Sequence, residues 1–164
     1  MLRRSIQAMS SRLEGRKVII RDAKRDDLVS MTGLLGELFQ IEADFTPDVR
    51  RQRVGLASLM KSATATLLVA VAGDKIVGMC TLQPLISTAE GGTVGIVEDL
   101  VVSHAWRGQG IGSMLLDAIE DTARRQHMTR LQLLSDIDNI PALHFYKMHA
   151  WCKTGLINLR KLFH

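Results

Sequence analysis

The sequence predicts an α+β fold in which helices cover a mixed β-sheet, and three features lead to that prediction. Apolar and β-branched residues concentrate in short runs at 66–71, 76–85 and 94–102, which favours strands. Apolar residues recur at intervals of three and four in 28–38 and 113–123, which favours amphipathic helices. A helical crossover leads from the third of these strands to a later one, and strands joined in this way are parallel.

The first half of the chain is expected to form one strand and two helices. Residues 18–21 are the strand, and a polar turn follows it. Asp26 or Asp27 can cap the first helix. Thr46 is placed to cap the second helix, which we expect at 47–61 because proline is favoured at the first helical position.

The second half begins with a hairpin, because the tight turn 72–75 joins the first two strand runs. A turn containing Gly91 and Gly92 then leads into the central strand. Residues 108–126 are expected to be helical and 130–135 to form a strand parallel to the central one.

Composition narrows the class of protein. The chain has 164 residues, enough for one domain with its own core, and no apolar run approaches the length that spans a bilayer. The net charge of +4 comes from scattered basic residues, so we expect a solvated surface and an anionic ligand, and neither nucleic acid nor membrane as a partner. Cys80 and Cys152 show no metal spacing, which indicates reduced thiols, no metal and a cytoplasmic location.

Residues 1–16 form a basic segment with apolar residues at helical spacing. This pattern is typical both of a targeting peptide and of a short helix docked on the domain. We expect the docked helix, followed by a single domain over 17–164.

Glycines dominate the junction between the central strand and the next helix, in the run Arg107-Gly108-Gln109-Gly110-Ile111-Gly112. The first N–H groups of a helix have no partner within it and attract anions, and glycine lets an anion approach them closely. The run matches neither the dinucleotide-binding spacing G-x-G-x-x-G, since Ser113 stands at the third glycine position, nor the P-loop. It therefore predicts a site for a different pyrophosphate.

The run does match [QR]-x-x-G-x-[GA], and residues 139–151 match N-x-x-A-x-x-F-Y-x-x-x-G-[FW], with Ala150 where glycine is usual. Together, in this order, the two motifs resemble the GNAT superfamily of acyl-CoA-dependent N-acyltransferases. The resemblance covers roughly 18–159. It implies a sheet in which the two parallel strands splay apart and leave a slot for the pantetheine arm of CoA.

The resemblance also implies acetyl-CoA as co-substrate, bound at the strand before the loop, at the loop and at the second motif. Asn139 is expected both to cap its helix and to bond the pantetheine. The implied cofactor-binding residues are Leu100, Val101, Val102, Arg107, Gly108, Gln109, Gly110, Ile111, Gly112, Ser113 and Asn139.

Acetyl transfer needs a neutral amine, although only about one alkylammonium in 10³ is neutral at pH 7. By resemblance Glu98 is the general base, acting directly or through water, and burial beside Val97 and Leu100 would have to make it more basic. Asp99 should point to the opposite face by strand alternation. Tyr146 is implied as the general acid that protonates the CoA sulfur, and a backbone N–H at a bulge near Leu100 or Val101 would meet the oxyanion. The alternatives to these catalytic roles are that Glu98 forms a structural salt bridge on its strand and that the Tyr146 ring only packs against the core.

Acidic residues gather between the first two helices, at Glu37, Glu42, Asp44 and Asp48. They would form an anionic wall of the acceptor site, or only a solvated loop. The function expected is acetyl transfer to a small cationic amine, by direct transfer in a ternary complex, as in diamine and aminoalkylphosphonate acetyltransferases. The alternatives are a non-catalytic acyl-CoA sensor and an acetyltransferase acting on protein N-termini or lysines. A homodimer is a further expectation from the resemblance.

Overall fold

The computed structural model describes residues 9–13, 16–41 and 46–163. The chain divides into two compact units, Met1–Leu133 and Leu134–His164. Each unit is described by itself.

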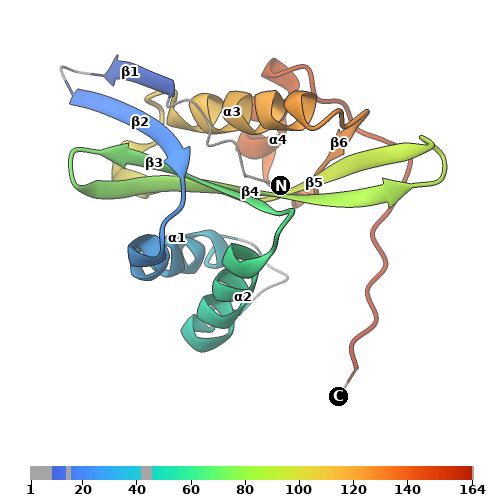
Figure 1. Ribbon diagram of the computed structural model, residues 1–164, viewed down its shortest axis with the longest axis horizontal. Coiled ribbons are helices and arrows are strands. Elements are labelled where there is room, and N and C mark those ends of the chain that lie inside the picture. The colour runs from blue at the N-terminus through green and yellow to red at the C-terminus, as the bar shows by residue number, and fades with distance from the viewer. Residues whose placement is uncertain (1–8, 14–15, 42–45, 164) are drawn as a thin grey trace. The chain divides into compact units, whose positions relative to one another are not determined.

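The first unit is built on a six-stranded sheet in the order β1-β2-β3-β4-β5-β6 (Figure 1). The strands are β1 (Met9–Leu13), β2 (Arg16–Asp22), β3 (Thr66–Ala72), β4 (Lys75–Ser87), β5 (Gly92–Val102) and β6 (Leu131–Gln132). Neighbouring strands are antiparallel except β5 and β6, which are parallel. The predicted α+β fold with a mixed sheet and a parallel pair is confirmed.

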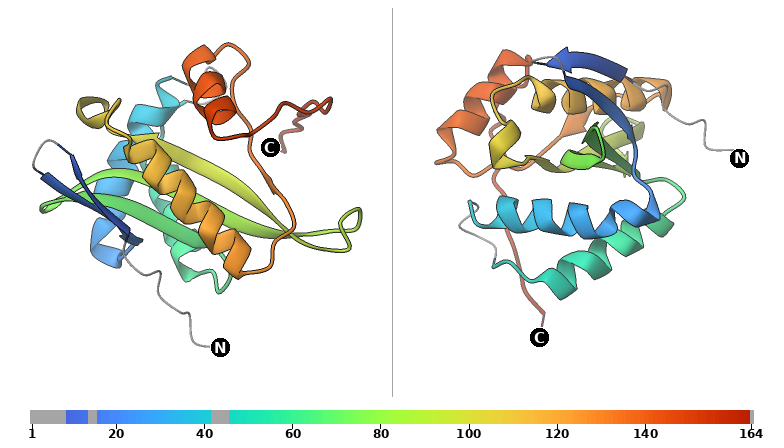
Figure 2. Two further views of the ribbon diagram at one scale, coloured as in Figure 1. Left: turned by 90° about the horizontal axis from the view of Figure 1, so that it is seen from above. Right: turned by 90° about the vertical axis from the view of Figure 1, so that its left-hand side faces the viewer.

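Helices cover both faces of this sheet, α1 and α2 on one and α3 on the other (Figures 1 and 2). The helices of the unit are α1 (Leu28–Phe39), α2 (Val49–Lys61), α3 (Ile111–Arg125) and the short 3₁₀ helices η1 (Arg25–Asp27) and η2 (His104–Trp106). Met31, Leu56 and Met79 belong to the core beneath α1 and α2, and α3 contributes Leu115, Leu116 and Ile119, which are fully buried. Each such side chain contributes about 1.5–3 kcal/mol by leaving water. None of the helices in the described part of the chain is long and apolar enough to cross a bilayer.

Residues 9–13 form strand β1, so the prediction of a helix over 1–16 is wrong there. β1 pairs antiparallel with β2, from Met9 opposite Ile20 to Leu13 opposite Arg16. The pairing satisfies backbone groups of β2 that would otherwise lie at the sheet edge, and helical periodicity in the sequence carries no information about such an edge. Residues 1–8 and 14–15 lie outside the described residues.

The second helix begins at Val49, and its cap is Asp48, so the prediction of a Thr46 cap is wrong. Asp48 has extended backbone, and its Oδ1 accepts the Arg51 N–H at 3.0 Å. The helix is thus capped by the Asp48 carboxylate, two residues after the predicted cap, Thr46.

Asp27 precedes α1, but its carboxylate bonds outside that helix. Arg21 donates to its two oxygens at 2.6 and 2.9 Å, and the Lys24 N–H donates at 2.6 Å. Burial, the largest single influence, would raise the pKa of Asp27, but these hydrogen bonds and the positive charges of Arg21 and Lys24 outweigh it and lower the pKa. Asp27 therefore ties the end of β2 to the start of α1.

Replacing Asp27 with Asn should destabilise the protein at pH 7 by about 1–3 kcal/mol, because Arg21 loses a buried charged partner. A lowered pKa in the folded state means that ionised Asp27 stabilises the fold above its ordinary pKa of 3.8 and that this contribution is lost as the pH falls below that value. Urea unfolding should therefore show a smaller difference between variant and wild type at pH 3 than at pH 7. Asp26→Asn, at an exposed neighbour, is the control, and a difference independent of pH would contradict the linkage.

The parallel pair is short, with Gly95 opposite Leu131 and Ile96 opposite Gln132. At this point the backbones approach closely, since the Gly95 N–H donates to the Arg130 carbonyl at 2.8 Å. A Cβ on Gly95 would lie 2.5 Å from Leu131 Cδ2 and 2.6 Å from Leu82 Cδ1. A side chain at position 95 would therefore require the Leu131 and Leu82 side chains to move.

Gly95→Ala should therefore cost about 1–3 kcal/mol of the free energy of unfolding, through overpacking at the β5–β6 contact. Gly33→Ala is the matched control. Gly33 is an exposed residue of α1, and a Cβ at this position would have no atom within 4 Å. Alanine stabilises a helix more than glycine does, by about 0.5–1 kcal/mol. Equal effects of the two substitutions in chemical denaturation would show that crowding at Gly95 is unimportant.

The second unit contains one helix, α4 (Ile140–Met148), followed by a chain without regular structure over 151–163. Asn139 Oδ1 accepts the Ala142 N–H at 3.2 Å, which confirms the predicted cap. At the other end, the Trp151 N–H donates to Tyr146 O at 3.0 Å and the Ala150 N–H to Lys147 O at 3.1 Å. This is a Schellman motif, in which the residue after the cap adopts the left-handed conformation.

Ala150 occupies that left-handed position, with φ of 62°. The conformation is costly for a residue with a Cβ, so the departure from glycine in the second motif produces local strain. Ala150→Gly should stabilise the end of α4 by about 0.5–1 kcal/mol, and hydrogen exchange at the last turn of α4 should slow accordingly. Faster exchange there would contradict this account.

Candidate functional site

The predicted anion site lies between β5 and α3. After η2 the chain passes through Gly108 and Gly110, whose φ angles are 71° and 77°. A Cβ at either position would meet no atom within 4 Å, so the left-handed backbone, and not crowding by the protein, requires glycine. The space beside the loop is open, as close approach of a ligand demands.

Helix α3 begins at Ile111, with Gly110 as its N-cap. The Met114 N–H donates to the Gly110 carbonyl at 3.1 Å and so completes the first turn. Within the described part of the chain, the N–H groups of Gly110, Ile111 and Gly112 donate to no protein group. These amides, at the positive end of a 15-residue helix, are suited to bind an anion.

Arg107 and Gln109 border this loop, and both side chains are held by backbone carbonyls. Arg107 Nε donates to Val102 O at 2.9 Å, and Gln109 Nε2 lies 3.4 Å from Ala105 O. Arg107 thus adds a positive charge of defined direction beside the open amides. Ser113 lies in the first turn of α3.

A bulge interrupts β5 before the loop. Thr81 pairs with Glu98 and Met79 with Val101, so Asp99 and Leu100 together face one residue of β4. Asp99 has a φ of 55°, and its Oδ2 lies 3.2 Å from the buried Thr81 hydroxyl. The bulge breaks the alternation on which the prediction for Asp99 relied.

The bulge also decides which backbone groups face away from β4. Because the Ser103 N–H donates to Val77 O at 2.9 Å, alternation directs the groups of Val101 toward β4 and those of Leu100 and Val102 toward the opposite edge. Strand β6 pairs with β5 only at Gly95 and Ile96 and leaves that edge uncovered by β6. Since Val102 O accepts from the Arg107 side chain, Leu100 offers both of its backbone groups there.

Glu98 is exposed, so the burial expected for a general base is not observed. Its Oε2 accepts a hydrogen bond from Gln83 Nε2 of β4 at 2.7 Å. None of the ion pairs between described residues involves Glu98, so the alternative of a structural ion pair finds no support there. Sequence reasoning missed Gln83, although it lies two residues beyond Thr81, which pairs with Glu98, on the same side of β4.

The acidic stretch is largely engaged in contacts with the protein. Asp48 caps α2, and Glu37 accepts hydrogen bonds from Ser103 Oγ at 3.0 Å and from the His104 N–H at 2.9 Å. Glu42 and Asp44 lie outside the described residues. Glu37 therefore faces the glycine loop, a position that the sequence does not predict.

Comparison with known proteins decides the family. The model of the acetyltransferase (GNAT) family matches residues 34–150, which include both sequence motifs. The chain belongs to the GNAT acetyltransferase family. It is an N-acetyltransferase, and enzymes of this family in general use acetyl-CoA as co-substrate.

The chain is similar to known proteins with several different descriptions. An aminoalkylphosphonate N-acetyltransferase of Salmonella typhimurium is 29% identical over 127 residues, 77% of this chain and 80% of the relative. The crystal structure of a transcriptional regulator from Bacillus halodurans is 26% identical, with a TM-score of 0.74 over 89% of this chain and 99% of that one. A possible acetyltransferase from Clostridium difficile has a TM-score of 0.77 at 19% identity, with the same coverage, and shows likeness of fold alone.

The GNAT match crosses the boundary between the two units, so Asn139 and Tyr146 belong to the family module although they lie in the second unit. Within that unit the Tyr146 ring packs at 5.3 Å from Phe145 and 6.0 Å from Trp151, measured between centroids. The Tyr146 ring thus contacts two aromatic neighbours within its own unit.

The burial of Cys80 and the grouping of possible metal ligands among the described residues bear on thiol and metal chemistry. Burial raises the pKa of the Cys80 thiol far above its ordinary value, and the charge of Asp99 adds to the effect, so Cys80 is no thiolate nucleophile. Among the described residues, no group of three or more His, Cys, Asp or Glu side chains could hold a metal ion.

Proposed function

We propose that this GNAT enzyme transfers the acetyl group of acetyl-CoA directly to a small cationic amine within a ternary complex. The observation that carries the proposal is the set of open amides at the start of α3 with Arg107 beside them. The relative that acetylates aminoalkylphosphonates supports an acceptor of small size.

The residues of the loop and of β5 fit the chemistry of CoA. In the proposal, the amides from Gly108 to Ser113 and the Arg107 guanidinium hold the diphosphate. The Leu100 carbonyl and the Val102 N–H bond the pantetheine as a neighbouring strand would, while Val101 pairs with Met79 of β4. Asn139 adds a bond from the second unit. Bound in this way, the cofactor supplies a thioester whose acetyl carbon accepts a nucleophile.

Glu98 takes the proton of the bound ammonium, directly or through a water, and Gln83 holds its carboxylate in place through the 2.7 Å hydrogen bond. As the new N–C bond forms and the C–S bond breaks, Tyr146 gives its phenolic proton to the departing sulfur. The Leu100 N–H, which the bulge turns away from β4, stabilises the oxyanion in between. The attacking nitrogen loses its second proton as the intermediate collapses, and this proton restores the Tyr146 phenol. The proton on Glu98 then leaves to solvent, so that one proton is released for each acetyl group transferred.

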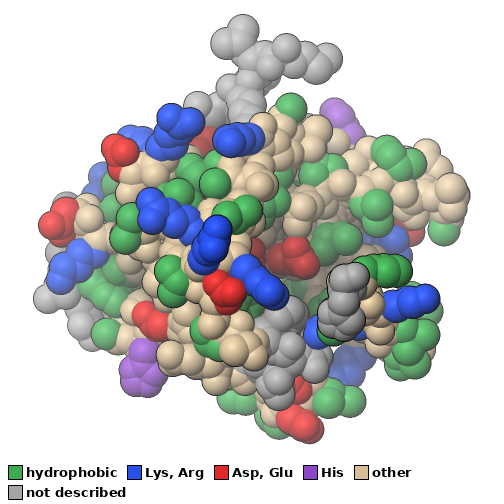
Figure 3. All heavy atoms as spheres, turned by 90° about the horizontal axis from the view of Figure 1, so that it is seen from below, with side chains coloured by type: hydrophobic (Ala, Val, Ile, Leu, Met, Phe, Trp, Pro, Cys, Tyr) green, Lys and Arg blue, Asp and Glu red, His purple; other side chains and the backbone are tan. Residues whose placement is uncertain are grey.

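The face that α1 and α2 form carries side chains of both signs of charge (Figure 3). Figure 3 shows Lys and Arg side chains on the face that α1 and α2 form, and α2 contributes the exposed Arg50, Arg51 and Arg53. An aminoalkylphosphonate has an amine for the base and an anionic group for such arginines, whereas a diamine has only positive charge. A panel containing both classes, together with peptides bearing a free N-terminus or lysine, therefore separates the candidate acceptors.

Calorimetry with CoA and a turnover assay with this panel test the proposal. The variants Glu98→Gln and Tyr146→Phe should each lose about 10²–10⁴ in rate while CoA affinity stays unchanged, because a general base or acid is removed. Gln83→Leu should give a smaller loss, since it removes only the bond that holds Glu98.

Tight CoA binding without turnover on any amine would favour the non-catalytic sensor, and absence of CoA binding would refute the proposal altogether. The cytoplasmic location and the homodimer stay predictions, which cell fractionation and sedimentation equilibrium can test.

A further inference from the structure

Glu37, in the last turn of α1, connects that helix to residues 103–107, which lead from β5 into the glycine loop, through three contacts. Its Oε1 accepts from the Ser103 hydroxyl at 3.0 Å, and its Oε2 accepts from the His104 N–H at 2.9 Å. Oε2 also lies 3.9 Å from Arg107 Nη2. One carboxylate thus touches the start, the first turn and the end of the segment that precedes the glycines.

These contacts fix the course of the chain from β5 into the loop. The bond to the His104 N–H serves the start of η2, where a backbone N–H has no partner within the helix. Arg107 is held from two sides, by Val102 O at 2.9 Å and by the Glu37 carboxylate. Since both members of that ion pair are about 40% exposed, at 40% and 38%, its own energy is small and the ordering comes from the hydrogen bonds.

We propose that Glu37 is a positioning residue for the diphosphate of CoA, a role that rests on the proposed function. By fixing Ser103, His104 and Arg107 before the ligand arrives, Glu37 reduces the loss of conformational freedom on binding. Its negative charge opposes an anion nearby. The proposal therefore requires that ordering of the loop by Glu37 favours CoA binding by more than the negative charge of Glu37 disfavours it. Removal of Glu37 should then weaken CoA binding.

Glu37→Ala should raise the Kd of CoA and the KM of acetyl-CoA about tenfold and leave kcat within about twofold, because Glu37 touches no reacting atom. Glu37→Gln keeps an oxygen for one of the two donors and should give an intermediate value. S-acetylpantetheine, a donor that lacks the diphosphate, makes no use of the loop. With this donor the kcat/KM of Glu37→Ala should equal that of the wild type.

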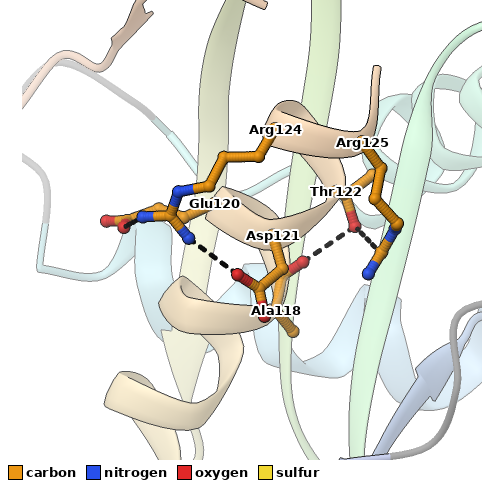
Figure 4. A network of polar contacts seen from close by, with 6 residues as sticks. All are labelled: Ala118, Glu120, Asp121, Thr122, Arg124 and Arg125. Carbon is orange, nitrogen blue, oxygen red and sulfur yellow. Dashed lines mark hydrogen bonds and ion pairs between the residues drawn. The ribbon is translucent and has the colours of Figure 1, made fainter. Parts of the chain in front are cut away.

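Glu120→Gln is the matched control, since it changes the net charge as Glu37→Gln does. Glu120 belongs to an ion-pair network on the later turns of α3, where Arg124 donates to Glu120 at 2.9 Å and to Asp121 at 2.7 Å (Figure 4). Glu120 lies nine residues beyond the first residue of α3, about 14 Å along its axis. The control should behave as wild type with both donors.

Equal losses with acetyl-CoA and S-acetylpantetheine would show a general structural role and overturn the proposal. Tighter CoA binding by Glu37→Ala or Glu37→Gln, or a change of less than twofold in Kd, would overturn it as well. If Glu37→Ala fails to fold, Glu37→Gln carries the same comparison of donors. Failure of the proposed function is distinguishable, because the wild type itself would then bind no CoA.

Discussion

The unpaired amides at the start of α3 are the constraint around which the first unit is organised. A helix must begin with N–H groups that lack partners inside it, and most helices cover these groups with a capping side chain. Here the N-cap is Gly110, which has no side chain to offer. The fold therefore leaves a concentration of positive dipole ends that have no protein acceptor among the described residues.

The sheet supports this arrangement through the same strand that feeds the loop. Gly95 allows β5 to approach β6 closely at one end, and the bulge at Asp99 and Leu100 turns backbone groups toward the edge that β6 does not cover. Strand, bulge and loop follow one another within twenty residues. A pantetheine arm and a diphosphate differ in chemistry, but a continuous chain segment can therefore present backbone groups to both.

Local signals in the sequence were sufficient where a residue acts on its immediate neighbours. The glycine spacing located the loop in which Gly108 and Gly110 adopt left-handed conformations, Asn139 was recognisable as a cap, and the crossover required the parallel pair. The wrong predictions for residues 9–13 and for the Thr46 cap concern groups whose partners the sequence pattern does not reveal. β1 adopts its conformation because β2 offers an edge, and a periodicity typical of a helix gives no sign of that edge.

The site shows the same division. Glu98 and Arg107 were identified by motif, whereas Gln83, Glu37 and the carbonyl of Val102 were not, although these three groups determine where the motif residues point. Glu37 and Ser103 are 66 residues apart. No spacing rule connects a helix end to a loop across that distance, so only the assembled fold identifies the pair.

The exposure of Glu98 bears on the order of the reaction. A carboxylate becomes a stronger base when water is removed from it, and in the first unit the side chain of Glu98 is open to solvent with one hydrogen bond from Gln83. In a direct transfer the acceptor must lie beside both the base and the thioester, so an acceptor that binds there removes water from Glu98 as it arrives. Desolvation of base and amine then occurs in the same step that brings the amine to the acetyl group. Under the proposed mechanism, the removal of water from Glu98 would accompany the binding of the acceptor, so the exposure of Glu98 in this structure is compatible with the proposed role of a base.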